Sequence, residues 1–149
     1  MTDADSITRA DSHGERLPWL VALGGAVAAL VVARSVEPSP TGIGTHERLG
    51  LPPCVFFKLT GLPCPSCGLT TSFAHAARLQ FYDALVTQPF GLVVFFLTLL
   101  FIPLACYLIY RRVPAERLLY GRWSNPVLYT LVVLYSLGWI YKIIVMRLL

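Results

Sequence analysis

The sequence has 149 residues, of which 56% are hydrophobic and only 13% are charged, and its formal net charge is +4. A soluble domain of this length is less apolar, and the apolar residues here form uninterrupted runs, so the composition predicts an integral membrane protein within a lipid bilayer. Basic residues do not alternate with aromatic residues along any stripe, which excludes nucleic acid as an expected partner.

Residues 1–16 are polar and of mixed charge, and they are predicted to form a disordered tail. The first apolar run, 17–33, is bounded by arginines and is just long enough to cross a bilayer. The tail before it is acidic rather than basic, so we expect an uncleaved transmembrane anchor and not a signal peptide.

A long connection, 34–89, follows the first run and holds three of the four cysteines. Its first part is rich in Pro and Gly, which predicts a loop. After Gly68, apolar residues recur every fourth position, which predicts one amphipathic helix lying in the membrane interface. This apolar face comprises Phe73, Ala77, Phe81 and Leu85, and the polar face His75, Arg78 and Tyr82.

Two further apolar runs, 90–109 and 127–149 including a short tail, match the length of about 20 helical residues that a bilayer core of about 30 Å requires. Lys142 is expected to extend to the interface from near the end of the last run. These runs contain no carboxylate, which argues against ion-coupled transport. The predicted fold is therefore all-α, with about three transmembrane helices plus one amphipathic interfacial helix.

The connection 110–126 is a basic loop, and such loops face the cytoplasm by the positive-inside rule. With three spans, this orientation places the N-terminus inside and the cysteine loop on the extracytoplasmic side. The charged residues of the connection are Arg111, Arg112, Arg117, Arg122 and Glu116.

Three cysteines, Cys54, Cys64 and Cys67, follow the spacing C-x9-C-x2-C, whereas Cys106 lies in an apolar run and is expected to be inert. A disulfide from Cys54 to Cys64 or Cys67 would pin an extracytoplasmic loop. Alternatively, the three thiolates with His75 or His46 could form a four-ligand zinc site. In a third interpretation the pair is redox-active, with Cys64 attacking and Cys67 resolving. The spacing alone leaves these alternatives open.

The motif around these cysteines, at about residues 50–105, resembles the DUF2752 family of uncharacterised bacterial membrane proteins, which implies a bacterial cytoplasmic membrane. Thr71 stands where the family usually has Arg, and Gln88 where it usually has Asn, so Arg78 is the candidate to replace the missing cation. The matching residues are Cys54, Thr60, Gly61, Cys64, Pro65, Cys67, Gly68 and Thr70.

The sequence thus predicts a small membrane protein with a structural or partner-binding cysteine loop, and the partner would be another membrane protein or a second copy. Thiol–disulfide exchange and zinc binding are the alternative functions. The hydrolase, nucleotide-binding and metalloprotease motifs are absent from the sequence, so no catalytic residue is assigned.

Overall fold

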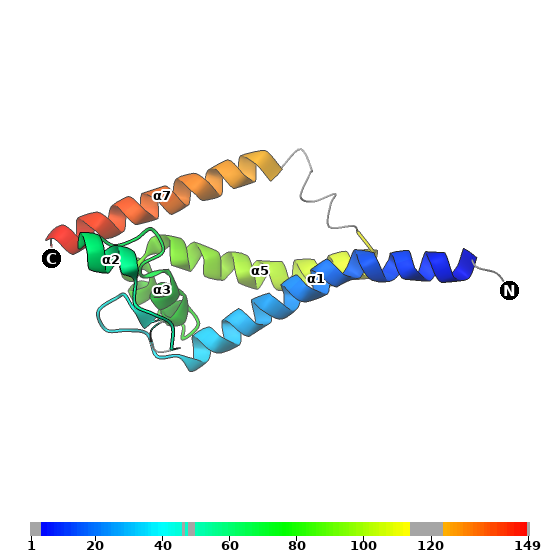
Figure 1. Ribbon diagram of the computed structural model, residues 1–149, viewed down its shortest axis with the longest axis horizontal. Coiled ribbons are helices and arrows are strands. Elements are labelled where there is room, and N and C mark those ends of the chain that lie inside the picture. The colour runs from blue at the N-terminus through cyan, green and yellow to red at the C-terminus, as the bar shows by residue number, and fades with distance from the viewer. Residues whose placement is uncertain (1–3, 46, 48–49, 114–123, 149) are drawn as a thin grey trace.

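The computed structural model describes residues 4–45, 47, 50–113 and 124–148, and these residues form helices and connecting loops without strands. Three helices dominate the molecule (Figure 1): α1 (Ala4–Ser35), α5 (Pro89–Arg111) and α7 (Ser124–Leu148). The all-α prediction is therefore confirmed for the described part of the chain.

Each long helix contains a stretch that is long and apolar enough to cross a membrane, namely Arg16–Ser35, Pro89–Arg111 and Asn125–Arg147. The first two predicted spans fall within these stretches, and so does the third apart from its short tail, so the protein is a multi-pass membrane protein. α1 begins at Ala4, well before its span, whereas the sequence predicts a disordered tail there. A helix that is already nucleated extends at low cost because each further residue adds a hydrogen bond.

α1 and α5 run antiparallel and pack against each other (Figure 1). Trp19 near the start of the first span donates its indole N–H to the carbonyl oxygen of Val113, 2.8 Å away and just beyond the end of α5. Its ring also lies 6.4 Å from that of Phe101. At the other end of the pair, Arg78 Nη1 donates to the carbonyl oxygen of Ala33 at 2.9 Å, which satisfies a free acceptor in the last turns of α1.

Residues 36–88, here called the loop region, contain three short helices: α2 (Val55–Thr60), α3 (Leu69–Ala76) and α4 (Phe81–Thr87). The structure thus has two helices, α3 and α4, where the sequence predicts one. The break lies at Leu79, whose φ of 64° is left-handed. Leu79 N–H donates to Ala76 O and Gln80 N–H to His75 O, both at 2.9–3.0 Å, which is the Schellman pattern that ends a helix.

The two short helices pack onto the start of α5. Phe73 of α3 lies 5.5 Å from Phe95 of α5, and Phe81 of α4 lies 6.4 Å from the same ring. Ser72 Oγ is buried 2.8 Å from the carbonyl oxygens of both Ala84 and Gln88, so it links α3 to the middle of α4 and to the residue that follows this helix. α3 is consequently packed inside the loop region, more deeply than a helix that only lies on the membrane surface.

The loop region gathers at one end of the three long helices, beside the C-terminal end of α7 and far from the N-terminus (Figure 1). The spans therefore place it on one membrane face, opposite the C-terminal end of α5. The connection between α5 and α7, the predicted basic loop, lies largely outside the described residues.

Candidate metal and thiol site

The chain around α2 returns on itself and brings its two ends together. Cys54 immediately precedes α2, and Gly61 ends the helix with a φ of 68°, which favours glycine. Thr60 Oγ1 donates to the carbonyl oxygen of Phe56 at 2.7 Å and accepts from the N–H of Leu62 at 3.2 Å, which fixes the reversal. The segment after α2 therefore runs back toward Cys54.

A tight turn places the other two cysteines opposite Cys54. Cys67 N–H donates to Cys64 O at 2.9 Å, and Leu69 N–H donates to Ser66 O at 3.1 Å as the chain enters α3. Gly68 between them has a φ of 90°, a conformation that residues with a side chain rarely adopt. The C-P-x-C-G motif thus forms a turn that leads directly into a helix.

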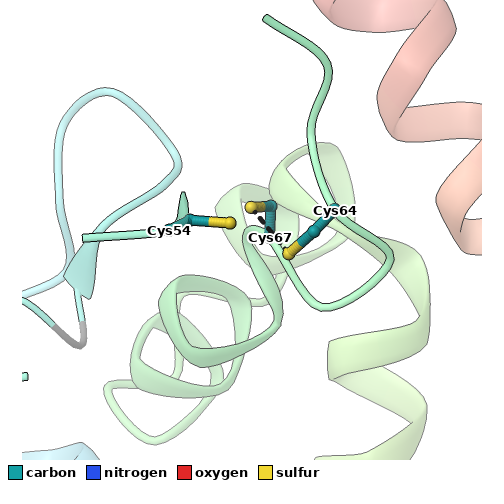
Figure 2. Close-up of side chains that lie close together, drawn as sticks. All are labelled: Cys54, Cys64 and Cys67. Carbon is teal, nitrogen blue, oxygen red and sulfur yellow. Dashed lines mark hydrogen bonds between the residues drawn. The ribbon is translucent and has the colours of Figure 1, made fainter. Parts of the chain in front are cut away.

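The three cysteine side chains point toward one another (Figure 2), and their Sγ atoms all lie within 4.8 Å of one another. Cys64 Sγ and Cys67 Sγ are 3.0 Å apart, and all three cysteines are free thiols. Cys67 is buried, whereas Cys54 and Cys64 are half-buried. Such a group of thiols is close enough to hold a metal ion. We call Cys54, Cys64 and Cys67 the cysteine cluster.

The paired thiols differ in acidity. Burial opposes ionisation of Cys64, but hydrogen bonds from Cys67 and Ser66 outweigh it and lower the pKa of the Cys64 thiol to about 7. Burial raises the pKa of Cys67, and its hydrogen bond with Cys64 raises it further, to about 12. Cys64 therefore ionises first, and Cys67 keeps its proton and donates it to the Cys64 thiolate.

Two elements far away in the sequence hold the cysteine turn. Trp139 of α7 donates its indole N–H to the carbonyl oxygen of Pro63 at 2.9 Å. Gln88, fully buried at the start of α5, donates its side-chain amide N–H to the carbonyl oxygen of Pro65 at 3.2 Å. The carbonyl groups on both sides of Cys64 are thereby fixed.

Lys142 of α7 supplies a cation beneath the turn. Its Nζ donates to the carbonyl oxygens of Gly42 at 3.2 Å and Thr87 at 3.1 Å, and the residue is only 5% exposed. The sequence predicts that this side chain extends to the membrane interface, but in the structure protein covers its ammonium group. The sequence did contain a signal for this role. An ionisable residue within an apolar span is costly, so such residues are functional candidates.

The other predicted site residues that the structure describes do not join the cluster. His75 Nδ1 is 2.9 Å from Gln80 Oε1. Among the described residues, the group of side chains close enough together to hold a metal ion comprises the three cysteines alone. His46, the other predicted fourth ligand, lies outside the described residues. Arg78 contacts α1 and the Ala74 carbonyl oxygen rather than the turn. Lys142, and not Arg78, is the cation beside Gly68 of the turn.

Two threonines follow the cysteine turn in the first turn of α3. Thr71 is buried, and its hydroxyl lies 2.8 Å from that of Thr45. Thr70 is exposed in the first turn of α3. Cys106 is exposed on α5, within the second span and away from the cluster.

A cavity of about 560 Å³ opens beside the cluster, and Cys54 and Cys67 form part of its wall. This space leaves room for a ligand next to two of the three thiols. Its lining also includes Ser39, Thr41, Glu47, Phe57 and Lys58.

The fold and the site together define a small helical membrane protein with a cysteine cluster on one membrane face. Residues 54–109 match the model of the family described as protein of unknown function, DUF2752, so the resemblance predicted from the motif is confirmed for this region. The comparisons with curated proteins and with solved structures give no match.

Proposed function

We propose that this protein binds a zinc ion through the thiolates of Cys54, Cys64 and Cys67. The observation that supports this function is that all three Sγ atoms lie within 4.8 Å of one another. A disulfide would use two of the sulfur atoms and leave the third beside it unused, whereas a metal uses all three. Thiolates are soft ligands, which suit Zn²⁺ or Cu⁺ better than Mg²⁺ or Ca²⁺.

A zinc ion with three protein ligands keeps a fourth position for water or another ligand. The cavity beside Cys54 and Cys67 has room for that ligand. His75 is engaged with Gln80, so we favour water or another small external ligand at this position.

The metal-held loop would serve as a rigid docking element rather than as an enzyme active site. α2 lies between the first and second zinc ligands, and its apolar side chains Val55, Phe56 and Leu59 are exposed. A zinc ion that ties both ends of α2 would fix the direction in which these side chains point. The expected partner is another membrane protein or a second copy of the chain, in the bilayer of a bacterial cytoplasmic membrane.

Metal analysis of the purified protein tests this function. We expect about one zinc ion per chain, and loss of that zinc in the single variants Cys54→Ser, Cys64→Ser and Cys67→Ser. Cys106→Ser is the matched control, because this cysteine lies in the second span, and it should keep the zinc. Equal zinc in wild type and in Cys64→Ser would refute the site.

Thiol–disulfide exchange is a second candidate, favoured by the 3.0 Å contact between Cys64 Sγ and Cys67 Sγ. The Cys64 thiolate would attack a disulfide of a partner protein, form a mixed disulfide and release one partner thiolate. Cys67 would then attack the mixed disulfide and release the second partner thiol, so the partner is reduced and a Cys64–Cys67 disulfide is formed. In a Cys67→Ala variant the mixed disulfide would persist, and failure to trap any partner would argue against exchange.

A further inference from the structure

Lys142 is a buried cation whose charge is not balanced by the atoms that it contacts. Its two hydrogen-bond acceptors, the carbonyl oxygens of Gly42 and Thr87, are neutral. Charged groups inside a membrane protein are costly and are usually paired with an opposite charge. An ammonium group has three N–H donors, so among the described residues the two carbonyl groups leave one donor and most of the charge without compensation.

The cysteine cluster lies next to this cation. The thiol of Cys67, once ionised, would interact electrostatically with the Lys142 ammonium group. Gly68, which follows Cys67, makes the approach possible: a Cβ atom at Gly68 would lie only 3.3 Å from Lys142 Cε and 3.0 Å from the carbonyl oxygen of Gly42. The lysine stem therefore runs directly beneath the turn that carries the thiols.

The same space contains an unpaired acceptor. Gln88 is fully buried, and its Oε1 has no hydrogen-bond partner among the described residues. A Cβ atom at Gly68 would lie 3.3 Å from this oxygen, the same distance as from Lys142 Cε. A donor on this side of Gly68 is thus expected, and a water molecule between this oxygen and the ammonium group can provide one.

Charge balance then connects the cation to the metal. Three thiolates carry a charge of about −3 and a zinc ion +2, so the filled cluster is an anion of about −1. We infer that Lys142 is the counter-cation of the cysteine cluster. Its positive charge, on a side chain of the third span, neutralises the net negative charge of the zinc ion and its three thiolates. This inference rests on the proposed zinc site and assigns to Lys142 a positioning role, not a catalytic one.

Substitutions at Lys142 separate its charge from its hydrogen bonds. Lys142→Gln keeps N–H donors and removes the charge, whereas Lys142→Arg keeps the charge. With zinc affinity measured by chelator competition in detergent, we expect Lys142→Gln to bind zinc roughly tenfold to hundredfold more weakly. Lys142→Arg should retain most of the wild-type affinity. Equal affinity of Lys142→Gln and wild type would overturn the inference.

Two control variants distinguish the local cation from general charge and from tethering of the turn. Lys58→Gln removes an exposed lysine beside the same cavity, and Trp139→Phe removes the other contact of α7 with the turn without changing charge. Lys58→Gln should bind zinc as the wild type does, and Trp139→Phe, which loosens the turn but keeps the cation, should lose less affinity than Lys142→Gln. A loss in either control as large as that of Lys142→Gln would mean that general charge or simple tethering, and not the local cation, sets the affinity.

A metal-independent readout separates failure of this inference from failure of the zinc site. If wild-type protein binds no zinc, the proposed function fails, and the rate of iodoacetamide modification of Cys64 in the metal-free protein becomes decisive. A counter-cation should make that rate about tenfold lower in Lys142→Gln at neutral pH, and equal rates would overturn the inference. Should Lys142→Gln not fold, Lys142→Met, a neutral residue of similar length, carries the same expectations.

Discussion

Trp139 donates its indole N–H to the carbonyl oxygen of Pro63, across 76 residues of chain and at 2.9 Å. This bond joins the third span directly to the turn that carries Cys64 and Cys67. A short turn with two thiols has little apolar surface of its own to bury, so its conformation depends on such contacts from neighbouring elements. The cysteine cluster is accordingly a property of the whole membrane domain, and variants in the spans should change its chemistry.

Cys64 is expected to react with electrophiles at unusually low pH. Because the pKa of its thiol is lowered to about 7 in the folded, metal-free protein, its thiolate is half-formed near that pH and its alkylation rate should level off above about pH 8. In denatured protein the midpoint should rise to about 8.5. Iodoacetamide rates, followed by mass spectrometry of the Cys64 peptide, measure this shift. A folded-state midpoint at or above that of the denatured protein would contradict it.

Cysteine labelling should reveal the orientation of the protein in the membrane. The positive-inside rule predicts that the cysteine cluster is extracytoplasmic, so a membrane-impermeant maleimide should label Cys64 in intact cells after chelation and reduction. A cysteine introduced by Val113→Cys, at the opposite end of α5, should be labelled only after lysis. The reverse labelling pattern would show that the protein has the opposite orientation in the membrane. A Cys106→Ser background removes the thiol in the second span.

Gly68→Ala should be more destabilising than Gly61→Ala, although both glycines have positive φ. At Gly61 nothing lies within 4 Å of an added Cβ, so the cost is the left-handed backbone alone, about 1–2 kcal/mol. At Gly68 the added atom would also press on the carbonyl oxygen of Gly42 at 3.0 Å, which adds about 1–3 kcal/mol of overpacking. Unfolding in denaturing detergent, followed by circular dichroism, compares the two. Similar losses would show that the Gly42 contact is unimportant.

Leu79→Gly should stabilise the protein by about 1 kcal/mol, because Leu79 has left-handed backbone (φ 64°) at the end of α3. The side chain is largely exposed, at 75%, so little packing is lost. Leu85→Gly is the matched control: it is also exposed but lies within α4, where glycine should cost about 1 kcal/mol. The same unfolding assay applies, and a loss of stability in both variants would contradict the role of the Leu79 conformation.

The three spans could be predicted because membrane insertion depends on a local property, an uninterrupted apolar run of sufficient length. The DUF2752 region was likewise predicted from a contiguous motif, and the match to residues 54–109 confirms it. The C-x9-C-x2-C spacing permitted a three-thiol site but did not require one. Whether Cys54 meets the other two depends on how the chain reverses after α2, which spacing alone does not determine.

The features that the sequence did not reveal depend on long-range contacts. The apolar spacing across 69–87 fits a single helix, and the break at Leu79 becomes favourable only when Ser72 can reach the carbonyl oxygens of Ala84 and Gln88. In the same way, Lys142 resembles any lysine near the end of a span until the loop region covers it. Predicting either feature requires knowing which segments lie opposite each other.

The hydrogen bond from Lys142 to Gly42 spans 100 residues of the chain, and this separation imposes an order on biosynthesis. The ribosome releases the loop region before the last span, so the cysteines emerge while their supporting lysine is still untranslated. Only when α7 has entered the bilayer can its lysine and tryptophan reach the turn. Maturation of the cluster therefore reports that insertion is complete. In a chain arrested after the second span, these thiols would lack the contacts that α7 supplies.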